Sequence, residues 1–301
     1  MLLGTLPRSH WQRHVARLDP ETDYEEIYRV LFAHEFPWDL NQALSFALFR
    51  TYAVPSIGRL LDETGAFARD TQKRYDDTAL LLDEPFQHGL RSDRGRRAIR
   101  RINQMHGAYD IAADDMRYVL STFVVMPKRW TDRYGWRRFS AGELRASVRY
   151  YQELGALMGI KDVPATYDAF DELMTTYEAE HFAYDEGGRR VADATLRLMS
   201  SFYPAFLARP MDVFSRCLMD EPLLAAFRLP APHPAVVRAA EGALRARARV
   251  EALMPARREP VFGTDVPRIV SYPDGYVIEE LGTFPRGCPV PHPSPTERSA
   301  G

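Results

Sequence analysis

The stretch RRAIRRINQMHGAYD, residues 96–110, decides how the chain is interpreted, because it predicts a helix whose single apolar stripe carries a histidine. At helical spacing Ile99, Ile102 and His106 share one face, while most of the arginines point elsewhere. A glycine follows the histidine directly and ends the segment. The pattern leaves two roles open for His106, a hydrogen-bonded residue of the core or a ligand to a buried group.

The segments on both sides of this stretch are helical as well. Apolar residues recur every three to four positions over residues 19–36, 41–53, 70–82, 113–126, 140–159, 166–182 and 189–207. No βαβ alternation and no Gly-rich phosphate loop accompanies them, which argues against nucleotide-binding folds. We therefore expect an all-α protein, with a single large helical catalytic domain over residues 1–258 and a globin-like helical core.

Local signals set several helix ends. Ser140 stands three residues before Glu143, the spacing of a capping box that begins a helix. Pro55 interrupts the longest apolar tract, residues 43–61, and predicts a kink or an end there. Pro127 is expected to end the helix that begins near residue 113.

The last part of the chain has a different composition. Residues 268–282, RIVSYPDGYVIEELG, alternate apolar and polar side chains around a Pro-Asp-Gly turn, which predicts a small β-hairpin. Residues 288–301 are rich in proline and predict a disordered tail. We therefore divide off residues 259–301 as a short hairpin appendage with a tail.

Composition excludes several classes of function. The formal net charge is −2, from 39 basic and 41 acidic side chains, so a nucleic-acid partner is not expected. Cys217 and Cys288 are far apart and form neither a disulfide framework nor a zinc motif, which fits a cytoplasmic protein. Arginines and a proline break the longest apolar tract, so we expect no integral membrane span.

Two further groups are candidates for chemistry. Arg74 and Thr78 lie one turn apart on one helix face, where an ordinary surface pair is the alternative. His181 continues the apolar face of Phe170 and Met174, which is compatible with a core histidine or with a contact to a metal or haem.

The sequence resembles the MpaB oxygenase family, which includes the catalytic domain of rubber oxygenase, the latex clearing protein. The resemblance covers roughly residues 20–230 and is carried by FPWDLNQALSFALFRTYAVPSIGRLLDETGAF, QKRYDDTALLL, the stretch from Arg96 to Trp130 and YEAEHFAY. Its most specific pieces are the R-x-x-x-T of Arg74 and Thr78 and the R-x-x-x-M-H that runs from Arg101 to His106.

The resemblance implies a haem-dependent oxygenase that cleaves a carbon–carbon double bond in an isoprenoid or another apolar alkene with dioxygen as co-substrate. His106 takes the place of the axial ligand of a b-type haem, and Arg74 and Thr78 take the distal side. Arg97 and Arg101 are candidates to meet the haem propionates. One departure is Asp77, which stands where rubber oxygenase has a lysine, and we find no equivalent of its catalytic glutamate.

Two alternatives belong to other classes. A non-haem metal oxygenase would use His106 and His181 as ligands, with an acid such as Glu178 completing the set. A helical module that binds an apolar ligand or partner would need no redox chemistry and would leave His106 merely buried.

Overall fold

The computed structural model describes residues 5–263 and 268–283, and these residues form helices and loops without a β-strand. The α-helices are α1 (His10–Val15), α2 (Tyr24–Val30), α3 (Pro37–Thr51), α4 (Pro55–Glu63), α5 (Ala66–Arg69), α6 (Thr71–His88), α7 (Asp93–His106), α8 (Ala113–Tyr134), α9 (Ala141–Leu157), α10 (Tyr167–His181), α11 (Glu186–Ser201), α12 (Ala208–Cys217), α13 (Glu221–Ala226) and α14 (Pro234–Leu253). A π-helix η1 (Leu31–Glu35) and the 3-10 helices η2 (Ala205–Leu207) and η4 (Ile278–Glu280) join them. The all-α fold is confirmed.

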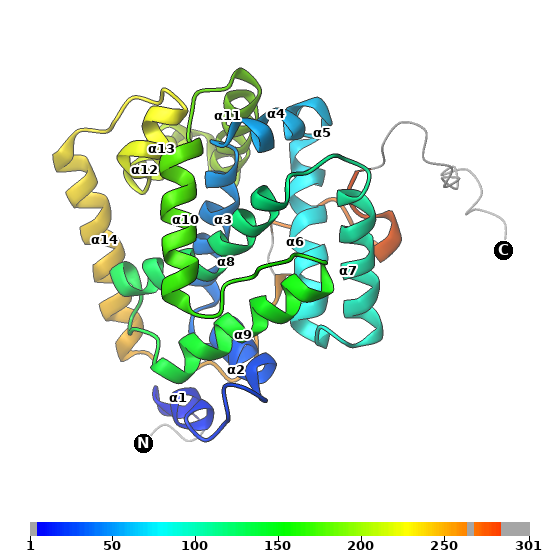
Figure 1. Ribbon diagram of the computed structural model, residues 1–301. Coiled ribbons are helices and arrows are strands. Elements are labelled where there is room, and N and C mark those ends of the chain that lie inside the picture. The colour runs from blue at the N-terminus through cyan, green and yellow to red at the C-terminus, as the bar shows by residue number, and fades with distance from the viewer. Residues whose placement is uncertain (1–4, 264–267, 284–301) are drawn as a thin grey trace.

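Helix α3 runs through the middle of the molecule (Figure 1), where it packs along α8. Helices α6 and α7 pack side by side, α10 packs on α8, α2 packs on α9, and α4 packs on α11. The largest apolar cluster lies between α2, α3, α6, α8, α9 and α10 and includes the fully buried rings of Tyr118 and Phe170. Burial of this shared interior is the main stabilising contribution to the fold.

Most helix ends follow the local sequence signals. Ser140 and Glu143 form the expected capping box at the start of α9. Helix α3 ends before Pro55, which is the first residue of α4. The expectation for Pro127 is wrong, because α8 continues through it to Tyr134. An interior proline costs a helix about 3 kcal/mol, and burial of the aromatic side chains one and two turns further on offsets that cost.

Two glycines let α4 and α11 approach each other closely. A Cβ atom on Gly58 would lie 2.4 Å from the carbonyl oxygen of Tyr52 and 2.6 Å from the Cα atom of Gly188. Any larger residue at these positions would push the two helices apart. The contact fixes the end of α3, and with it Tyr52, against α11.

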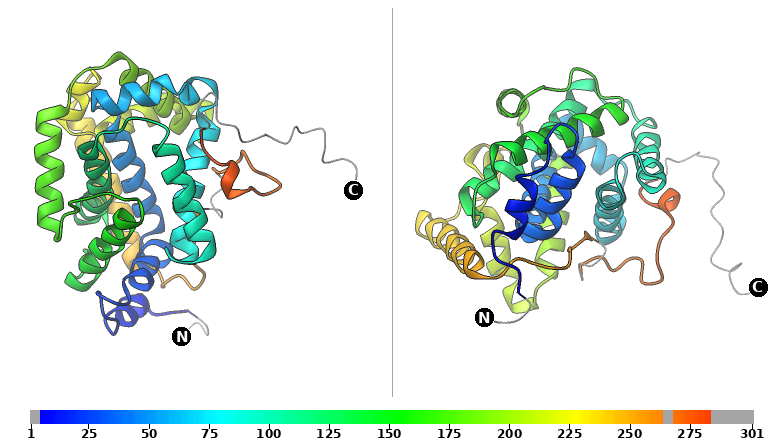
Figure 2. Two further views of the ribbon diagram at one scale, coloured as in Figure 1. Left: turned by 45° about the vertical axis from the view of Figure 1, so that its right-hand side comes forward. Right: turned by 90° about the horizontal axis from the view of Figure 1, so that it is seen from below.

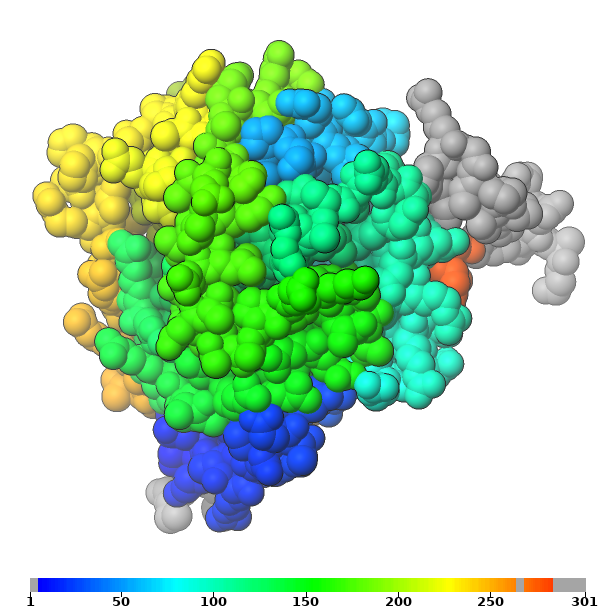
Figure 3. All heavy atoms as spheres, in the orientation of Figure 1, coloured from blue at the N-terminus to red at the C-terminus, as the bar shows by residue number. Residues whose placement is uncertain are grey.

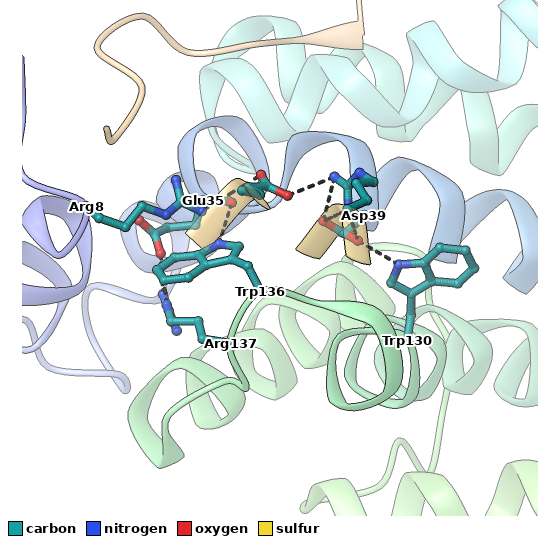
Figure 4. Close-up of polar contacts among 8 residues, drawn as sticks. Arg8, Glu35, Asp39, Trp130, Trp136 and Arg137 are labelled. Atoms are coloured by element: carbon teal, nitrogen blue, oxygen red, sulfur yellow. Dashed lines mark hydrogen bonds and ion pairs between the residues drawn. The ribbon is translucent and has the colours of Figure 1, made fainter. Parts of the chain in front are cut away.

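Two buried acids anchor the junction of η1 and α3 (Figure 4). Arg137 donates to a carboxylate oxygen of Glu35 over 2.7 Å, and the Trp136 ring nitrogen donates to the Glu35 carbonyl oxygen over 3.1 Å. Asp39 accepts a hydrogen bond of 2.9 Å from the Trp130 ring nitrogen. These charged hydrogen bonds compensate the burial of both carboxylates, which are 1% and 0% exposed.

Residues 268–283 form an extended segment, here called the C-terminal strap, that lies along α6 and α7 (Figures 1 and 2). The hairpin expected here is wrong, because the strap contains turns and η4 and no strand. The backbone N–H groups of Val270 and Ser271 donate to the Asp76 carboxylate instead of to a second strand. Leu281 is fully buried against α6 and α7. The proline-rich tail predicted for residues 288–301 lies outside the described residues.

Side chains of α6 and α7 hold the strap by charged contacts. The Tyr276 hydroxyl donates to Glu84 over 2.6 Å, and the Tyr272 hydroxyl donates to Asp77. Arg97 pairs with Glu279 through two hydrogen bonds of 2.7 and 2.8 Å. The strap emerges at the edge of α7 in the space-filling view (Figure 3). It therefore braces the helix pair that carries the sequence-predicted site.

Acid is expected to loosen the strap. The hydrogen bonds from Arg97 lower the pKa of Glu279 from 4.5 to about 2. A carboxylate whose pKa is lower in the folded chain than in the unfolded chain stabilises the folded state at pH values above its unfolded pKa. That stabilisation is lost as the pH falls through the folded pKa. Hydrogen exchange of strap amides, corrected for the intrinsic effect of pH, should therefore rise between about pH 4.5 and pH 2.

The matched variants are Glu279→Gln and Glu280→Gln. Glu280 is exposed, and no ion pair involves it in the described part of the chain. Glu279→Gln should raise strap exchange at neutral pH, whereas Glu280→Gln should behave as the parent. Equal strap protection in all three proteins at neutral pH would show that the Arg97 pair does not hold the strap.

Candidate functional site

His106 is the last residue of α7, and its imidazole is turned toward the protein. Its Nδ1 atom is buried, and no described residue forms a hydrogen bond with it. Burial lowers the pKa of His106, and the positive charge of nearby Arg74 lowers it further. The imidazole is therefore held neutral, the form that binds a metal ion. The role as a ligand is favoured over that of a hydrogen-bonded core residue, because no described residue is bonded to this buried ring nitrogen.

Arg74 and Thr78 lie one turn apart on α6, as their spacing predicts. The Arg74 guanidinium donates to the Thr78 hydroxyl, which in turn donates to the Arg74 carbonyl oxygen over 2.9 Å. Arg74 is half-buried, and its guanidinium carbon lies 5.7 Å from the centre of the Phe67 ring. The structure thus brings Arg74, Thr78 and His106 into one neighbourhood from two adjacent helices.

Thr78 also lines a cavity of about 160 Å³. The walls come from α2, α3, α6, α8, α9 and α11 and are mainly apolar and aromatic. Residues that line this inner cavity include Tyr28, Phe32, Leu44, Leu48, Tyr52, Ala79, Leu82, Phe86, Phe123, Tyr150, Tyr151 and Leu154. An apolar cavity bordered by a few polar groups is the usual form of a site for a small apolar ligand.

Tyr52 is a polar residue of this neighbourhood that the sequence analysis did not identify. It lies at the end of α3, lines the inner cavity and packs its ring against Phe67 with ring centres 5.7 Å apart. Burial raises the pKa of Tyr52, although the charge of Arg74 and a hydrogen bond with Thr195 oppose the shift. No sequence motif connects Tyr52 at the end of α3 with Arg74 on α6. Their proximity is therefore seen only in the folded structure.

Arg97 and Arg101, the candidates for propionate binding, are both engaged by the C-terminal strap. Arg101 is 4% exposed and donates to the carbonyl oxygens of Leu281 and Thr283 over 2.8 and 2.9 Å. Arg97 forms its two hydrogen bonds with Glu279. The sequence analysis did not include the strap in the site, and a propionate would meet these groups only by displacing it.

His181 is exposed at the end of α10, in contrast to the buried side chains of Phe170 and Met174 on the same helix. Its ring stacks on Tyr177 with centres 3.9 Å apart, and its Nδ1 atom donates to the Tyr177 carbonyl oxygen over 3.0 Å. The expected core position is therefore not observed, since the apolar face of α10 ends one turn before the histidine.

The Glu178 carboxylate, proposed as a further metal ligand, is committed to other partners. Arg50 Nε donates to one of its oxygens over 2.8 Å, and the Tyr118 hydroxyl donates to the same oxygen over 3.1 Å. Arg50 also pairs with Asp220 over 2.6 Å. Within residues 5–263 and 268–283, no group of three or more His, Cys, Asp or Glu side chains is arranged to hold a metal ion.

Comparison with known proteins identifies the family of the chain. Residues 40–252 match the family model described as ER-bound oxygenase mpaB/B'/Rubber oxygenase, catalytic domain. The chain belongs to this family. Its resemblance to the family, inferred from the motifs around Arg74 and His106, is confirmed.

Individual relatives agree with the family model. The chain is 32% identical over 230 residues to ER-bound oxygenase mpaB of Penicillium brevicompactum, a match covering 70% of this chain and 58% of the fungal protein. It is 31% identical over 224 residues to ER-bound oxygenase mpaB of Penicillium roqueforti (strain FM164), covering 67% and 74%. The chain thus spans little more than half of the P. brevicompactum protein.

A solved structure of latex clearing protein in the closed state has the same fold. The TM-score is 0.50 at 18% sequence identity, over 83% of this chain and 73% of that chain.

In the described residues of the MpaB-family chain, no helix is both long and apolar enough to cross a membrane. The fungal relatives are named as ER-bound, and a cytoplasmic location for this chain stays a prediction.

Proposed function

We propose that this chain is a haem-dependent oxygenase that cleaves a carbon–carbon double bond in an isoprenoid or another apolar alkene. Membership of the MpaB and rubber oxygenase family supports oxygenase chemistry with dioxygen. The single observation that carries the haem assignment is the buried Nδ1 atom of His106 beside Arg74, which has no hydrogen-bond partner among the described residues.

His106 fits a residue that would hold haem iron. Its imidazole lies at a helix end, burial favours the neutral form that such a ligand needs, and no described residue forms a hydrogen bond with its Nδ1 atom. Bound haem b would supply dioxygen binding and activation. The proposal assigns Arg101 to holding the strap against α7, and Arg97 to the same task unless a propionate displaces Glu279.

Arg74 supplies hydrogen-bond donors next to Thr78, which lines the apolar cavity. The Thr78 hydroxyl donates to the Arg74 carbonyl oxygen and accepts from the Arg74 guanidinium, so it holds that guanidinium in place. Fixed donors of this kind stabilise negative charge that develops on oxygen. The aromatic walls exclude water and accept an apolar chain. We assign Arg74 to this role, and Thr78 to holding the Arg74 guanidinium in place.

The non-haem alternative gains no support from the geometry. His181 is exposed, and both His181 and Glu178 are bonded to protein groups. A binding module without redox chemistry would use the same apolar cavity. Iron analysis of the purified protein distinguishes it from the oxygenase, because the module would contain no iron.

Changes at Arg74 and Thr78 should affect turnover more than cofactor content. Removal of one fixed donor typically lowers turnover by about 100-fold or more, and loss of the Thr78 hydroxyl would release the Arg74 guanidinium that it holds. Arg74→Ala and Thr78→Ala should therefore both retain haem and lose most alkene cleavage. The measurement is product formation per haem, with dioxygen uptake as a second readout. Arg100→Ala, on the exposed side of α7, is the control. Parent-like turnover in both variants would remove the pair from the mechanism.

A further inference from the structure

A second cavity of about 70 Å³ adjoins the inner cavity. The two share Ser45 of α3 and Thr195 and Met199 of α11 as lining residues. The second cavity, here called the outer cavity, continues between α3, α11 and α12 to the first residue of the C-terminal strap, Arg268. The two adjoining cavities are here called the elongated site, with Thr78 and Asp83 lining its inner part and Arg268 lining its outer part.

The outer cavity is apolar except at its end. Its walls include Trp38, Phe46, Phe49, Phe214, Leu218 and Met219. Among the lining residues in the described part of the chain, Arg268 alone is charged. The hydroxyl groups of Ser45 and Ser215 donate to carbonyl oxygens of their own helices, so they are not free to donate to a ligand.

Arg268 has no acidic partner within the described residues. Its guanidinium donates to the Tyr203 hydroxyl over 3.3 Å and lies 5.2 Å from the centre of the Phe202 ring. The nearby Asp76 carboxylate accepts hydrogen bonds from Gln72 and from the strap residues Val270 and Ser271. A half-buried arginine held by aromatic rings, without a carboxylate, can still bind an anion.

The inner cavity has an acidic lining residue in place of a basic one. Asp83 lines the inner cavity five residues beyond Thr78 on α6 and accepts a hydrogen bond of 3.2 Å from the Gly263 backbone. A ligand with one anionic end would be attracted to Arg268. Charge thus selects one direction of binding, with the apolar chain running inward past Thr195 to Thr78.

We propose that the substrate is an elongated apolar chain with a terminal anionic group, a carboxylate or a phosphate, and that Arg268 binds this group. The proposal rests on the proposed function for the position of the reacting double bond beside Thr78. Recognition of the anion is independent of that chemistry, because it depends only on the outer cavity. Arg268 acts here as a specificity-determining residue and takes no part in bond cleavage.

Binding measurements with three probes of equal chain length test this proposal. Oleic acid, oleyl phosphate and oleyl alcohol are titrated by calorimetry into the full-length protein as purified, below the concentrations at which they aggregate. The variants are Arg268→Gln, the charge-conserving Arg268→Lys, and Arg197→Gln as a control on the exposed side of α11. Circular dichroism establishes that each variant is folded.

The parent should bind at least one anionic probe about tenfold or more tightly than the alcohol, as expected for a hydrogen bond to a charged group. Arg268→Gln should abolish this preference, while Arg268→Lys and Arg197→Gln should retain it. Preference for one of the two anions identifies the head group. The proposal is overturned if the alcohol binds as well as both anions, if the preference survives in Arg268→Gln, or if no probe binds.

The two proposals fail separately. A protein without haem that shows the Arg268-dependent preference would contradict the proposed cofactor and leave this inference standing. A haem protein that binds the alcohol and the acids equally would contradict this inference alone.

Discussion

His106→Ala is expected to leave a folded protein that no longer retains haem. The substitution removes the imidazole that is proposed to hold the iron, while the end of α7 itself tolerates alanine well. The side chain makes no hydrogen bond at Nδ1 that folding would lose. The measurement is the haem content of the purified variant, by absorption and by pyridine haemochrome assay, together with its far-ultraviolet circular dichroism.

His34→Ala is the matched control for this prediction. His34 is also a half-buried histidine whose Nδ1 atom has no hydrogen-bond partner among the described residues, and burial lowers its pKa too. His34 lies in η1, and its ring packs at a tilt against Trp11 of α1 with ring centres 3.9 Å apart. Arg74 lies on a different helix, α6. His34→Ala should retain haem. An unchanged Soret band in His106→Ala would show that His106 is not the axial ligand.

The second large effect is expected at Glu178, on stability instead of function. Glu178→Ala would leave Arg50 buried with only the partly exposed Asp220 as a partner. Breaking a buried ion pair by removing one partner typically costs about 3–5 kcal/mol. The free energy of unfolding, measured by urea denaturation, should fall by that amount, and α10 should separate from α3 and α8.

Two further variants distinguish loss of the ion pair from loss of packing. Asp220→Asn keeps the cap of α13 and weakens only the exposed side of the Arg50 network, so its cost should stay within about 1 kcal/mol. The double variant Arg50→Met with Glu178→Leu replaces both charges with apolar groups and should recover most of the lost stability. Equal stability of Glu178→Ala and the parent would mean that the Arg50 guanidinium is hydrated in the folded variant.

Sequence patterns predicted the helical class and many of the boundaries because these depend on local chemistry. The capping box at Ser140 and the helix start at Pro55 are properties of single segments. The adjacency of Arg74 and Thr78 follows from helical spacing alone. Their approach to His106 was implied by the family resemblance, since no local rule joins α6 and α7 at that point.

Tertiary contacts explain what the sequence did not predict. The strap alternates like a hairpin, but Asp76 binds its backbone N–H groups and η4 buries its apolar residues. Pro127 is held within α8 by burial of residues further along the helix. His181 continues the apolar stripe of α10 in sequence. It is nevertheless exposed, because it lies past the part of α10 that packs against other helices. In each case, packing between distant segments outweighed a local preference.

The most direct test of the central claim is the absorption spectrum of the purified parent protein, taken with iron and porphyrin analysis of the same sample. The account predicts an intense Soret band and equal amounts of iron and porphyrin, near one of each per chain, with both lost in His106→Ala. Active protein that contains iron without porphyrin, or that contains neither, would contradict it.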